Sequence, residues 1–452
     1  MPISSREPNR RAPTFGHHGA VTATPLPLSD LLTDARARDA ADPAPMRSRF
    51  EMPAAHAGGA YDHVAYFAGN SLGLLPRTSR SAVEEVMTSW SQYAVGGHFS
   101  GSRAWSTMVE ALREPMASLV GAQSDEVVVM NTLTVNLHML MAAFYRPSGT
   151  RTKIVIEAGA FPSDDYAVAS QARHHGLDPD DVIIRLTPRP GEDLLRTEDV
   201  LATLGAAGDT VALVLMGGIN FRTGQLFDIP AITDGAHRIG AYVLWDLAHA
   251  AGNVPLALHD WDVDAAAWCT YKYLNSGPGA IGAAFIHRKH VDRPDLVRLS
   301  GWWGNASATR FEMTQEIQRG AGALGWQVSN PPILSLAPIR ASLDIFTEAG
   351  GMSVLRARSL RLTGYLEGLF DGLSRTHQLS QLTPRTTADR GAQLSVLVDD
   401  ARLRTEQLIE EHDVIPDERP PNIIRFAPIP LYSSYEDCWR AALALEAVVP
   451  LR

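Results

Sequence analysis

Short runs of apolar residues recur through the middle of this 452-residue chain and are separated by longer stretches of mixed polarity. The runs lie at residues 126–130, 153–157, 181–185, 211–216, 241–245, 265–269 and 282–286. Runs of this length predict β-strands, and the helix-length segments between several of them predict crossover connections. Alternation of strand and helix is typical of an α/β fold with a largely parallel sheet. The unbroken apolar run at 211–216 favours a strand buried on both faces.

The pattern changes after Pro331 and Pro332. A long helix is predicted from 336 to 348, then strands at 393–398 and 422–426 flanked by helices around 402–411 and 435–448. Another short helix is predicted from 31 to 40. We therefore expect a disordered, Pro- and Arg-rich extension over residues 1–28 and a segment over 29–65 that packs on the small domain. A large domain over 66–335 and a smaller C-terminal α/β domain over 336–452 complete the prediction.

Composition excludes several classes of protein. Hydrophobic residues make up 45% of the chain and charged residues 20%, which is ordinary for a globular protein. A net charge of −10 disfavours a nucleic-acid partner, and the apolar runs are too short to span a membrane. Two cysteines, Cys269 and Cys438, cannot form a disulfide framework, so we expect a reducing, cytoplasmic setting. The N-terminus has no apolar stretch of the kind found in secretory signals.

Asp246 and Lys272 carry the first indication of chemistry. Asp246 ends an apolar run, and Lys272 follows a second one within Tyr271-Lys272-Tyr273. Taken singly, such residues are usually a helix cap and a solvated turn residue. A pyridoxal phosphate enzyme needs this pair, because the lysine amine binds the cofactor aldehyde and the carboxylate keeps the pyridine nitrogen protonated. With His249 three residues beyond Asp246, we favour the functional interpretation and predict pyridoxal 5′-phosphate as the cofactor.

Eight short sequences identify a family. They lie at residues 67–74, 131–138, 160–164, 246–250, 271–275, 301–304, 328–332 and 424–432. In this order and spacing they resemble kynureninase, from about residue 30 to the end. The resemblance implies the transferase-like fold type I of pyridoxal phosphate enzymes, with the large domain binding the cofactor, and a homodimer. It also implies a hydrolase acting on carbon–carbon bonds in ketonic substances, in tryptophan catabolism or the synthesis of NAD precursors. Its substrates would be L-kynurenine and 3-hydroxy-L-kynurenine, cleaved between Cβ and Cγ to L-alanine and anthranilate or 3-hydroxyanthranilate.

The resemblance also implies roles for residues that contact the cofactor. Lys272 would bind it and move the substrate proton, Asp246 would pair with the pyridine nitrogen, and His249 would lie near its oxygen substituent. The alternative for His249 is a core histidine bonded to Asp246 or to backbone. Further implied contacts are Leu133, Thr134, Phe161, Ser163, Asp164, Gly217 and Tyr271. For Thr134 the alternative is a helix N-cap, and for Phe161 it is a core residue.

A second set of residues is implied for the substrate. We expect Arg425 to hold the substrate α-carboxylate, because a guanidinium group binds a carboxylate through two parallel hydrogen bonds. Trp302 and Asn330 resemble residues that reach the cofactor or substrate from the neighbouring subunit, although interface packing is an alternative for Trp302. Ser71 and His98 resemble substrate contacts. His98 together with Asn330 matches members that prefer the ring-hydroxylated substrate. No metal is predicted.

The sequence departs from the family pattern at two positions, and two alternative functions remain. Gly217 stands where some members have serine, and Arg222 where an aromatic residue is expected. A cysteine desulfurase-like lyase of the same fold would need a catalytic cysteine on a mobile loop, whereas Cys269 and Cys438 fall in a predicted strand and the last helix. A non-catalytic pyridoxal-binding regulator would need an attached DNA-binding module, and no basic helix-turn-helix pattern precedes residue 65.

Overall fold

The computed structural model describes residues 27–291 and 293–452. Its larger sheet has the strand order β4-β10-β9-β8-β7-β5-β6. These strands are β4 (Val127–Val129), β5 (Lys153–Glu157), β6 (Ile183–Leu186), β7 (Val211–Gly217), β8 (Tyr242–Asp246), β9 (Ala265–Trp268) and β10 (Ala283–Ile286). Strands β6, β5, β7, β8 and β9 run parallel, and β10 is antiparallel to both of its neighbours, β9 and β4. The predicted largely parallel α/β sheet is therefore confirmed.

One predicted strand begins two residues late. The run expected from residue 181 becomes β6 only at Ile183, because a short helix, α6 (Pro179–Val182), comes first. Pro179 stands at the first helical position, and the Asp178 side chain accepts a hydrogen bond from the Asp180 backbone. A capping aspartate followed by proline is a strong helix start, and here it prevails over the apolar pattern.

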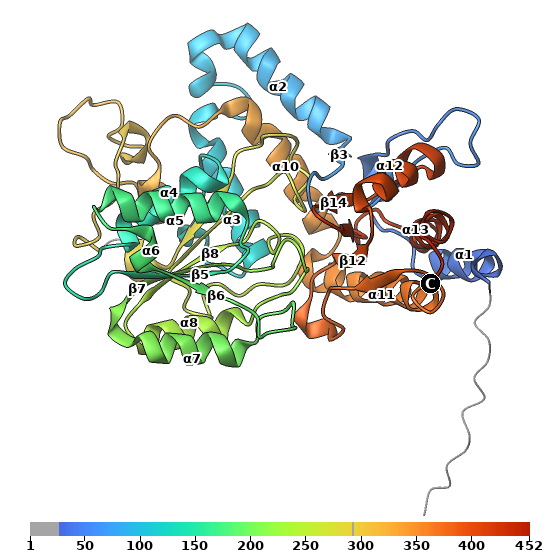
Figure 1. Cartoon of the computed structure of the whole chain (residues 1–452). Coiled ribbons are helices and arrows are strands. Elements are labelled where there is room, and N and C mark those ends of the chain that lie inside the picture. The colour runs from blue at the N-terminus through green and yellow to red at the C-terminus, as the bar shows by residue number, and fades with distance from the viewer. Residues whose placement is uncertain (1–26, 292) are drawn as a thin grey trace, which may run out of the picture.

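Helices cover both faces of the larger sheet (Figure 1). On one side lie α4 (Leu133–Phe144) and α5 (Pro162–His174), and on the other α7 (Thr197–Ala207) and α8 (Ile229–Arg238). Helix α3 (Met108–Val120) packs against β4 and α10. Residues 211–216 are all buried, as predicted for a strand covered on both faces. Two long helices, α2 (Thr78–Tyr93) and α10 (Ile333–Glu348), pack against each other, and α2 projects from the molecule. A short helix, α9 (Arg288–Val291), follows β10.

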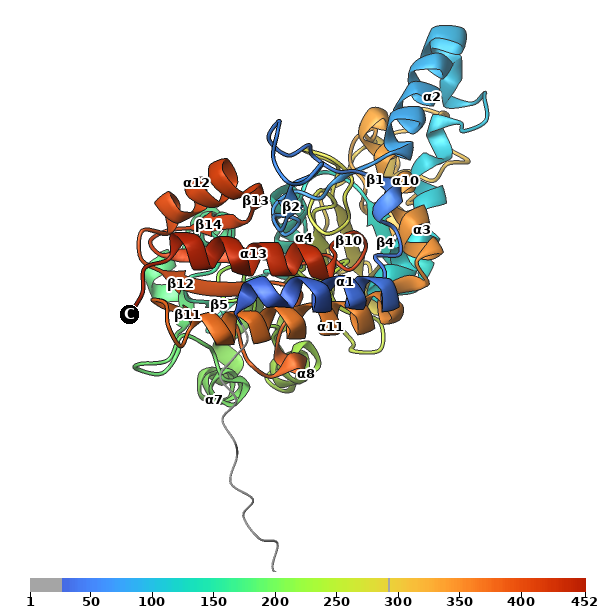
Figure 2. The same ribbon diagram turned by 90° about the vertical axis from the view of Figure 1, so that its right-hand side faces the viewer.

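A second, four-stranded sheet has its own apolar core. Its strands are β11 (Leu379–Gln381), β12 (Leu394–Val398), β15 (Ile423–Phe426) and β14 (Asp417–Arg419), in that order. The helices near it are α11 (Gly351–Leu373), α12 (Ala401–His412), α13 (Tyr435–Val448) and the N-terminal α1 (Leu32–Ala41), which lies beside α13 (Figure 2). The predicted strands and helices of this region are confirmed.

The segment after α1 contributes strands to two small sheets. Strand β2 (Ala65–Tyr66) pairs with β13 (Val414–Ile415), and β1 (Phe50–Glu51) pairs with β3 (Leu75–Pro76). The indole N–H of Trp439 in α13 donates to the Leu28 carbonyl oxygen at 2.7 Å. The segment therefore packs against strand β13 and helix α13. The domain boundaries expected from the sequence remain a prediction. The extension expected to be disordered lies outside the described residues up to residue 26.

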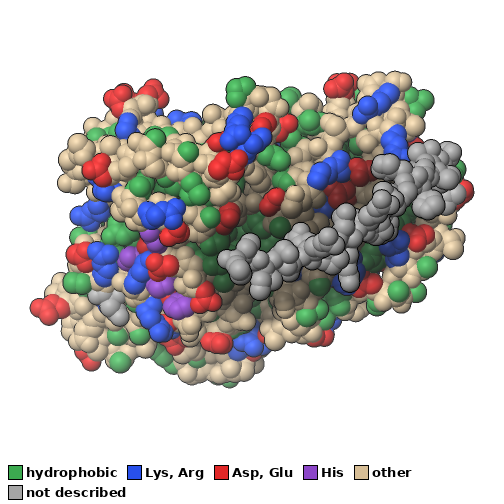
Figure 3. Space-filling model, turned by 90° about the horizontal axis from the view of Figure 1, so that it is seen from below, with side chains coloured by type: hydrophobic (Ala, Val, Ile, Leu, Met, Phe, Trp, Pro, Cys, Tyr) green, Lys and Arg blue, Asp and Glu red, His purple; other side chains and the backbone are tan. Residues whose placement is uncertain are grey.

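Within the part of the chain described here, no helix has both the length and the hydropathy needed to cross a bilayer. The face seen in Figure 3 interleaves acidic and basic side chains, so it presents no broad positive surface.

Candidate active site

The candidate site lies where three parallel strands end. Glu157 ends β5, Gly217 ends β7 and Asp246 ends β8, with Gly217 paired to Asp246 in the sheet register. Ligands of parallel α/β sheets bind at this carboxyl edge, because the strand-to-helix loops and the helix N-termini meet there.

A cavity of about 360 Å³ opens at this edge, within the range of roughly 300–1,000 Å³ usual for small-molecule sites. It is lined by Ser71, Thr132, Leu133, Thr134, Glu157, Phe161, Ser163, Asp164, Gly217, Ile219, Phe221, Asp246, Ala248, His249, Tyr271, Lys272 and Arg419. Most predicted cofactor residues are thus brought together. A larger cleft of about 960 Å³, around residues 192–198 and 381–389, contains none of them.

Lys272 and His249 are in direct contact inside the cavity. The Lys272 Nζ lies 3.0 Å from His249 Nε2 and 5.8 Å from the centre of the Phe161 ring. Burial lowers the pKa of His249 well below its ordinary value, and the positive charges of Lys272 and Arg425 act in the same direction. A neutral His249 accepts a hydrogen bond from the Lys272 ammonium at Nε2. Its proton then sits on Nδ1, which has no partner among the described residues.

Asp164 and Asp246 form a buried carboxyl pair. Burial and the neighbouring Asp246 carboxylate raise the pKa of Asp164 well above its ordinary value. Burial also raises the pKa of Asp246, but the Ala248 backbone N–H at 2.7 Å and the charge of Lys272 oppose this increase. Of the two acids, Asp164 therefore holds a proton more readily, and Asp246 is the one that ionises first.

Two helices begin at the cavity. Thr132 precedes α4 and Phe161 precedes α5, and neither side chain caps its helix. Backbone N–H groups in the first turn of α4 are thus available to an anion at the positive end of the helix dipole, whereas α5 begins with Pro162, which has no N–H. The Thr134 and Ser163 hydroxyl oxygens, 2.6 Å apart, link the two turns. Thr134 stands inside α4, so the alternative that it caps this helix is wrong.

These features fit pyridoxal 5′-phosphate. Lys272 offers an amine for the aldehyde, Asp246 a buried carboxylate for the pyridine nitrogen, and the two helix starts a cradle for the phosphate. The Phe161 side chain is 47% exposed at the cavity rather than packed in a core, so the core alternative is wrong. Tyr271 also lines the cavity, and burial raises the pKa of its hydroxyl, which stays protonated.

Four predicted residues lie away from the cavity wall. Arg425 is buried next to it, where its guanidinium group contacts the carboxylate of Asp417. His98 packs edge-on against Trp105, with ring centres 5.2 Å apart. The Trp302 indole donates to a backbone carbonyl at 2.8 Å, and Asn330 is exposed. In one chain, therefore, His98, Trp302 and Asn330 do not reach the cofactor cavity.

Six residues that line the cavity were not predicted from the sequence: Thr132, Glu157, Ile219, Phe221, Ala248 and Arg419. Burial raises the pKa of Glu157 to about 7, although the Asn220 amide donates to it at 2.8 Å. The ring of Phe221 packs edge-on against Phe161 at 5.3 Å. Glu157 ends a predicted buried strand, as Asp246 does, and this shared position was the signal that would have found it.

The structure also explains one departure. A Cβ atom on Gly217 would lie 3.0 Å from a carboxylate oxygen of Glu157, so a larger residue would have to displace that side chain. Arg222 does not line the cavity, whereas the preceding Phe221 presents an aromatic ring there. The backbone oxygen of Arg222 accepts a hydrogen bond from the Ser395 hydroxyl at 2.6 Å.

Comparison with known proteins decides the family. Residues 355–445 match the model of the kynureninase C-terminal domain. A kynureninase from Salinispora tropica is 56% identical over 413 residues, which cover 91% of this chain and 96% of the relative. One from Myxococcus xanthus is 48% identical over 429 residues, covering 94% and 98%. The chain belongs to the kynureninase family.

Solved structures confirm the fold. A cystine C–S lyase in complex with cysteine persulfide superposes with a TM-score of 0.73 at 18% identity, covering 86% of this chain and 98% of the other. The same type of lyase with glycine covalently linked to its pyridoxal phosphate gives 0.70 at 18% identity, covering 84% and 96%. A cysteine desulfurase from Thermococcus onnurineus gives 0.69 at 17% identity, covering 85% and 94%. The protein therefore has the type I fold of pyridoxal phosphate enzymes. Its membership of the kynureninase family, together with the cavity around Lys272 and Asp246, makes pyridoxal 5′-phosphate its cofactor.

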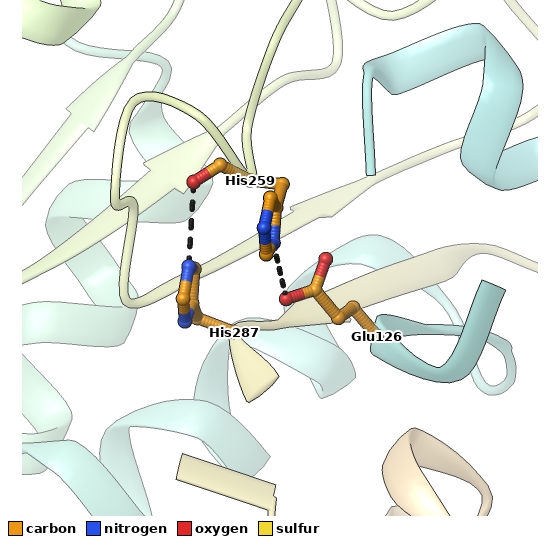
Figure 4. A group of neighbouring side chains, drawn as sticks. All are labelled: Glu126, His259 and His287. Atoms are coloured by element: carbon orange, nitrogen blue, oxygen red, sulfur yellow. Dashed lines mark hydrogen bonds and ion pairs between the residues drawn. The ribbon is translucent and has the colours of Figure 1, made fainter. Parts of the chain in front are cut away.

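A separate group, Glu126, His259 and His287, has the composition of a metal site (Figure 4). The side-chain atoms that could bind a metal already have hydrogen-bond partners, however. One Glu126 oxygen contacts His259 Nδ1 at 2.9 Å and the Arg288 backbone N–H at 2.8 Å, while His287 Nδ1 accepts the Lys289 backbone N–H at 3.1 Å. The two imidazole rings are parallel, 2° apart in tilt and 5.0 Å between centres, so their lone pairs do not converge. We interpret the group as a structural link between the start of β4 and the end of β10.

Proposed function

We propose that the protein hydrolyses the Cβ–Cγ bond of L-kynurenine to L-alanine and anthranilate, using pyridoxal 5′-phosphate. One observation carries the proposal: Lys272 and Asp246 face one cavity, in a chain 56% identical to a kynureninase over 91% of its length. The desulfurase-like alternative needs a catalytic cysteine near the cofactor. Cys269 and Cys438 are both buried, and neither lines the cavity.

Each part of the cofactor has residues to hold it. Bound pyridoxal phosphate supplies an electron sink that stabilises negative charge on the substrate Cα. Lys272 would hold the aldehyde, and the ionised Asp246 would accept a hydrogen bond from the protonated ring nitrogen. Thr134, Ser163 and the first-turn N–H groups of α4 would bind the phosphate. Phe161 would cover one face of the ring.

The same residues move the proton. Lys272 would hold the cofactor aldehyde before substrate binds, and its amine would then take the proton from the substrate Cα. Neutral His249 accepts a hydrogen bond from this amine at 3.0 Å and so keeps it directed into the cavity. Asp164, protonated beside Asp246, stabilises the ionised carboxylate without adding a second negative charge.

Replacement of Lys272 by alanine tests this function. Lys272→Ala should lose the visible absorbance of bound cofactor and nearly all release of anthranilate from kynurenine. The chain has only three lysines, so borohydride reduction and peptide mapping can place the label on Lys272, Lys153 or Lys289. Lys153→Ala is the matched control and should behave as wild type. A label on Lys153 or Lys289, or full turnover by Lys272→Ala, would refute the assignment.

We further propose that the active form is a homodimer in which Trp302 and Asn330 complete the partner's site. Large apolar side chains are unusually exposed near Trp302: Phe99 is 63%, Phe311 48% and Met313 67% exposed. Phe311 contacts both Phe99 and Trp302 at 5.3 Å between ring centres, so the exposed patch is continuous. Contiguous exposed apolar surface of this kind marks a protein interface.

Both cysteines are unpaired, which supports a reducing, cytoplasmic setting.

We propose 3-hydroxykynurenine as the preferred substrate. The support is His98 and Asn330, whose side chains can hydrogen-bond a phenol hydroxyl; the His98 Nδ1 atom is buried and has no partner among the residues that the structure describes. Leaving such groups unpaired beside an unsubstituted ring costs roughly 1–3 kcal/mol, or about ten- to a hundredfold in affinity. Side-by-side kcat/KM values for the two substrates test this. Equal or reversed efficiencies would contradict it.

A further inference from the structure

The guanidinium group expected to bind the substrate carboxylate already has protein partners at both terminal nitrogens, and only its Nε has none among the described residues. Arg425 has no exposed side-chain surface, and its Nη2 contacts both the Asp417 carboxylate and the Ser71 hydroxyl, the latter at 3.0 Å. Its Nη1 donates to the Phe221 carbonyl oxygen at 2.7 Å. Both terminal nitrogens are therefore engaged within the protein. Arg425 and Asp417 together form a buried ion pair that carries no net charge.

A second arginine, Arg419, lies on the open side of this pair. It belongs to β14, whose Asp417 is paired with Arg425 of β15 in the sheet register. Arg419 donates from Nη1 to Asp417 and from Nη2 to the Ser71 hydroxyl at 3.1 Å. Unlike Arg425, Arg419 lines the cavity, and 30% of its side chain is exposed.

The charges decide which residue attracts a carboxylate. Two guanidinium groups and one carboxylate meet at the Ser71 hydroxyl, which leaves one net positive charge. Because the Asp417–Arg425 pair is neutral as a unit, this net charge faces the cavity on Arg419. A substrate carboxylate placed there would restore neutrality, whereas without Arg419 it would face a neutral pair that includes an anion.

We propose that Arg419 binds the α-carboxylate of the amino-acid substrate together with Arg425, and that Asp417 and Ser71 hold the two guanidinium groups side by side for this purpose. The inference rests on the proposed function, because it concerns the amino-acid substrate of the same site. It makes Arg419 a substrate-binding residue and Asp417 a positioning residue.

Binding of L-alanine and L-alaninamide to the holoenzyme tests the proposal. The two ligands differ in the carboxylate alone, and the spectrum of the bound cofactor reports their affinities. Arg419→Gln should weaken L-alanine binding roughly ten- to a hundredfold and leave L-alaninamide within about threefold, as expected for loss of a charge-assisted contact. Arg419→Lys, which keeps the charge without the forked geometry, should give an intermediate loss. Exposed Arg402→Gln is the charge-matched control and should bind both ligands as wild type does.

Kinetics with kynurenine complete the test. In Arg419→Gln, KM should rise by a similar factor while kcat stays within about threefold, because the contact is made equally in ground and transition states. Equal weakening of both ligands, or no weakening of either, would overturn the role of Arg419. Failure of the wild type to cleave kynurenine would instead refute the proposed function. A variant with lowered thermal stability and cofactor content but unchanged ligand selectivity would show a structural role only.

Discussion

At the scale of single residues, burial limits how many of the acidic side chains in the cavity can be ionised. Glu157, Asp164 and Asp246 are buried beside a single amine, Lys272. Ionising all three acids in a water-poor site would be costly, so burial raises their pKa values. The Ala248 N–H and Lys272 select Asp246 as the acid that stays ionised. The residue that must face a pyridinium is thus charged before any ligand arrives.

Asp246→Asn should therefore fold but lose catalysis. An amide cannot stabilise the protonated ring nitrogen as a carboxylate does, and we expect kcat to fall by several orders of magnitude. The measurement is turnover of kynurenine at matched cofactor content, with thermal unfolding as the check on folding. Near-normal turnover would remove Asp246 from the electron-sink role.

Glu157 should give a distinctive dependence of stability on pH. Its pKa rises from 4.5 to about 7 on folding. Between pH 4.5 and about pH 7, the folded protein therefore retains a proton on Glu157 that the unfolded chain releases. The contribution of Glu157 to the free energy of unfolding is thus full below the unfolded pKa. It is lost as pH rises through about 7, by about 3 kcal/mol at most.

Glu157→Gln should remove this contribution. Urea unfolding of the cofactor-free protein at pH 5 and pH 8 should show the variant gaining stability, relative to wild type, at the higher pH. His249, with its lowered pKa, gives the opposite slope in both proteins and cancels in the comparison. Exposed Glu114→Gln serves as the control. An identical pH dependence in Glu157→Gln and wild type would show that Glu157 is ionised in the folded protein.

At the scale of elements, prediction succeeded where burial is uniform. The runs at 153–157 and 211–216 are covered on both faces, so their apolar character is continuous and plain in the sequence. The longest helix, α11, was not singled out because it begins at Gly351 and contains Gly364, Gly368 and Gly372. Glycine disfavours an isolated helix, but a buried leucine-rich face packed against α13 stabilises this one.

Loop contacts could not be predicted, since they join distant segments. Gly73 illustrates this: its backbone N–H donates to the Tyr271 carbonyl oxygen at 2.8 Å. An added Cβ would lie 2.5 Å from the Lys272 carbonyl oxygen and 2.3 Å from the Asn275 side chain. The loop that ends with Gly73 is therefore pressed against the backbone of the cofactor lysine.

Gly73→Ala should consequently displace Lys272. We expect kcat to fall at least tenfold and thermal stability to drop, because overpacking against backbone typically costs about 1–3 kcal/mol. Gly205→Ala in α7, where a Cβ meets nothing within 4 Å, is the matched control and should be neutral or stabilising. Wild-type kinetics in Gly73→Ala would show that the loop yields without moving the lysine.

At the scale of the whole molecule, the sequence predicted the family and most of the cofactor cavity through motifs. It did not predict the Asp417–Arg425 pairing or the cavity position of Arg419, because these depend on the packing of β14 beside β15. His98, Trp302 and Asn330 lie away from the cavity in one chain, and their roles stay predictions that require a second chain.

Complementation tests the shared site. Mixing Lys272→Ala chains with Asn330→Ala chains should restore activity, because each mixed dimer would contain one site free of both substitutions. Subunit exchange followed by mass measurement establishes that mixed dimers form. Inactive mixed dimers would show that each site is built within one chain.

The Ser71 hydroxyl contacts Arg419 and Arg425, which follow it by 348 and 354 positions. Lys272, Asp246 and the starts of α4 and α5 all precede residue 280. During synthesis, then, Lys272, Asp246 and the starts of α4 and α5 leave the ribosome well before the arginines that face the substrate. Synthesis of these cofactor residues is thus complete before that of the substrate arginines begins.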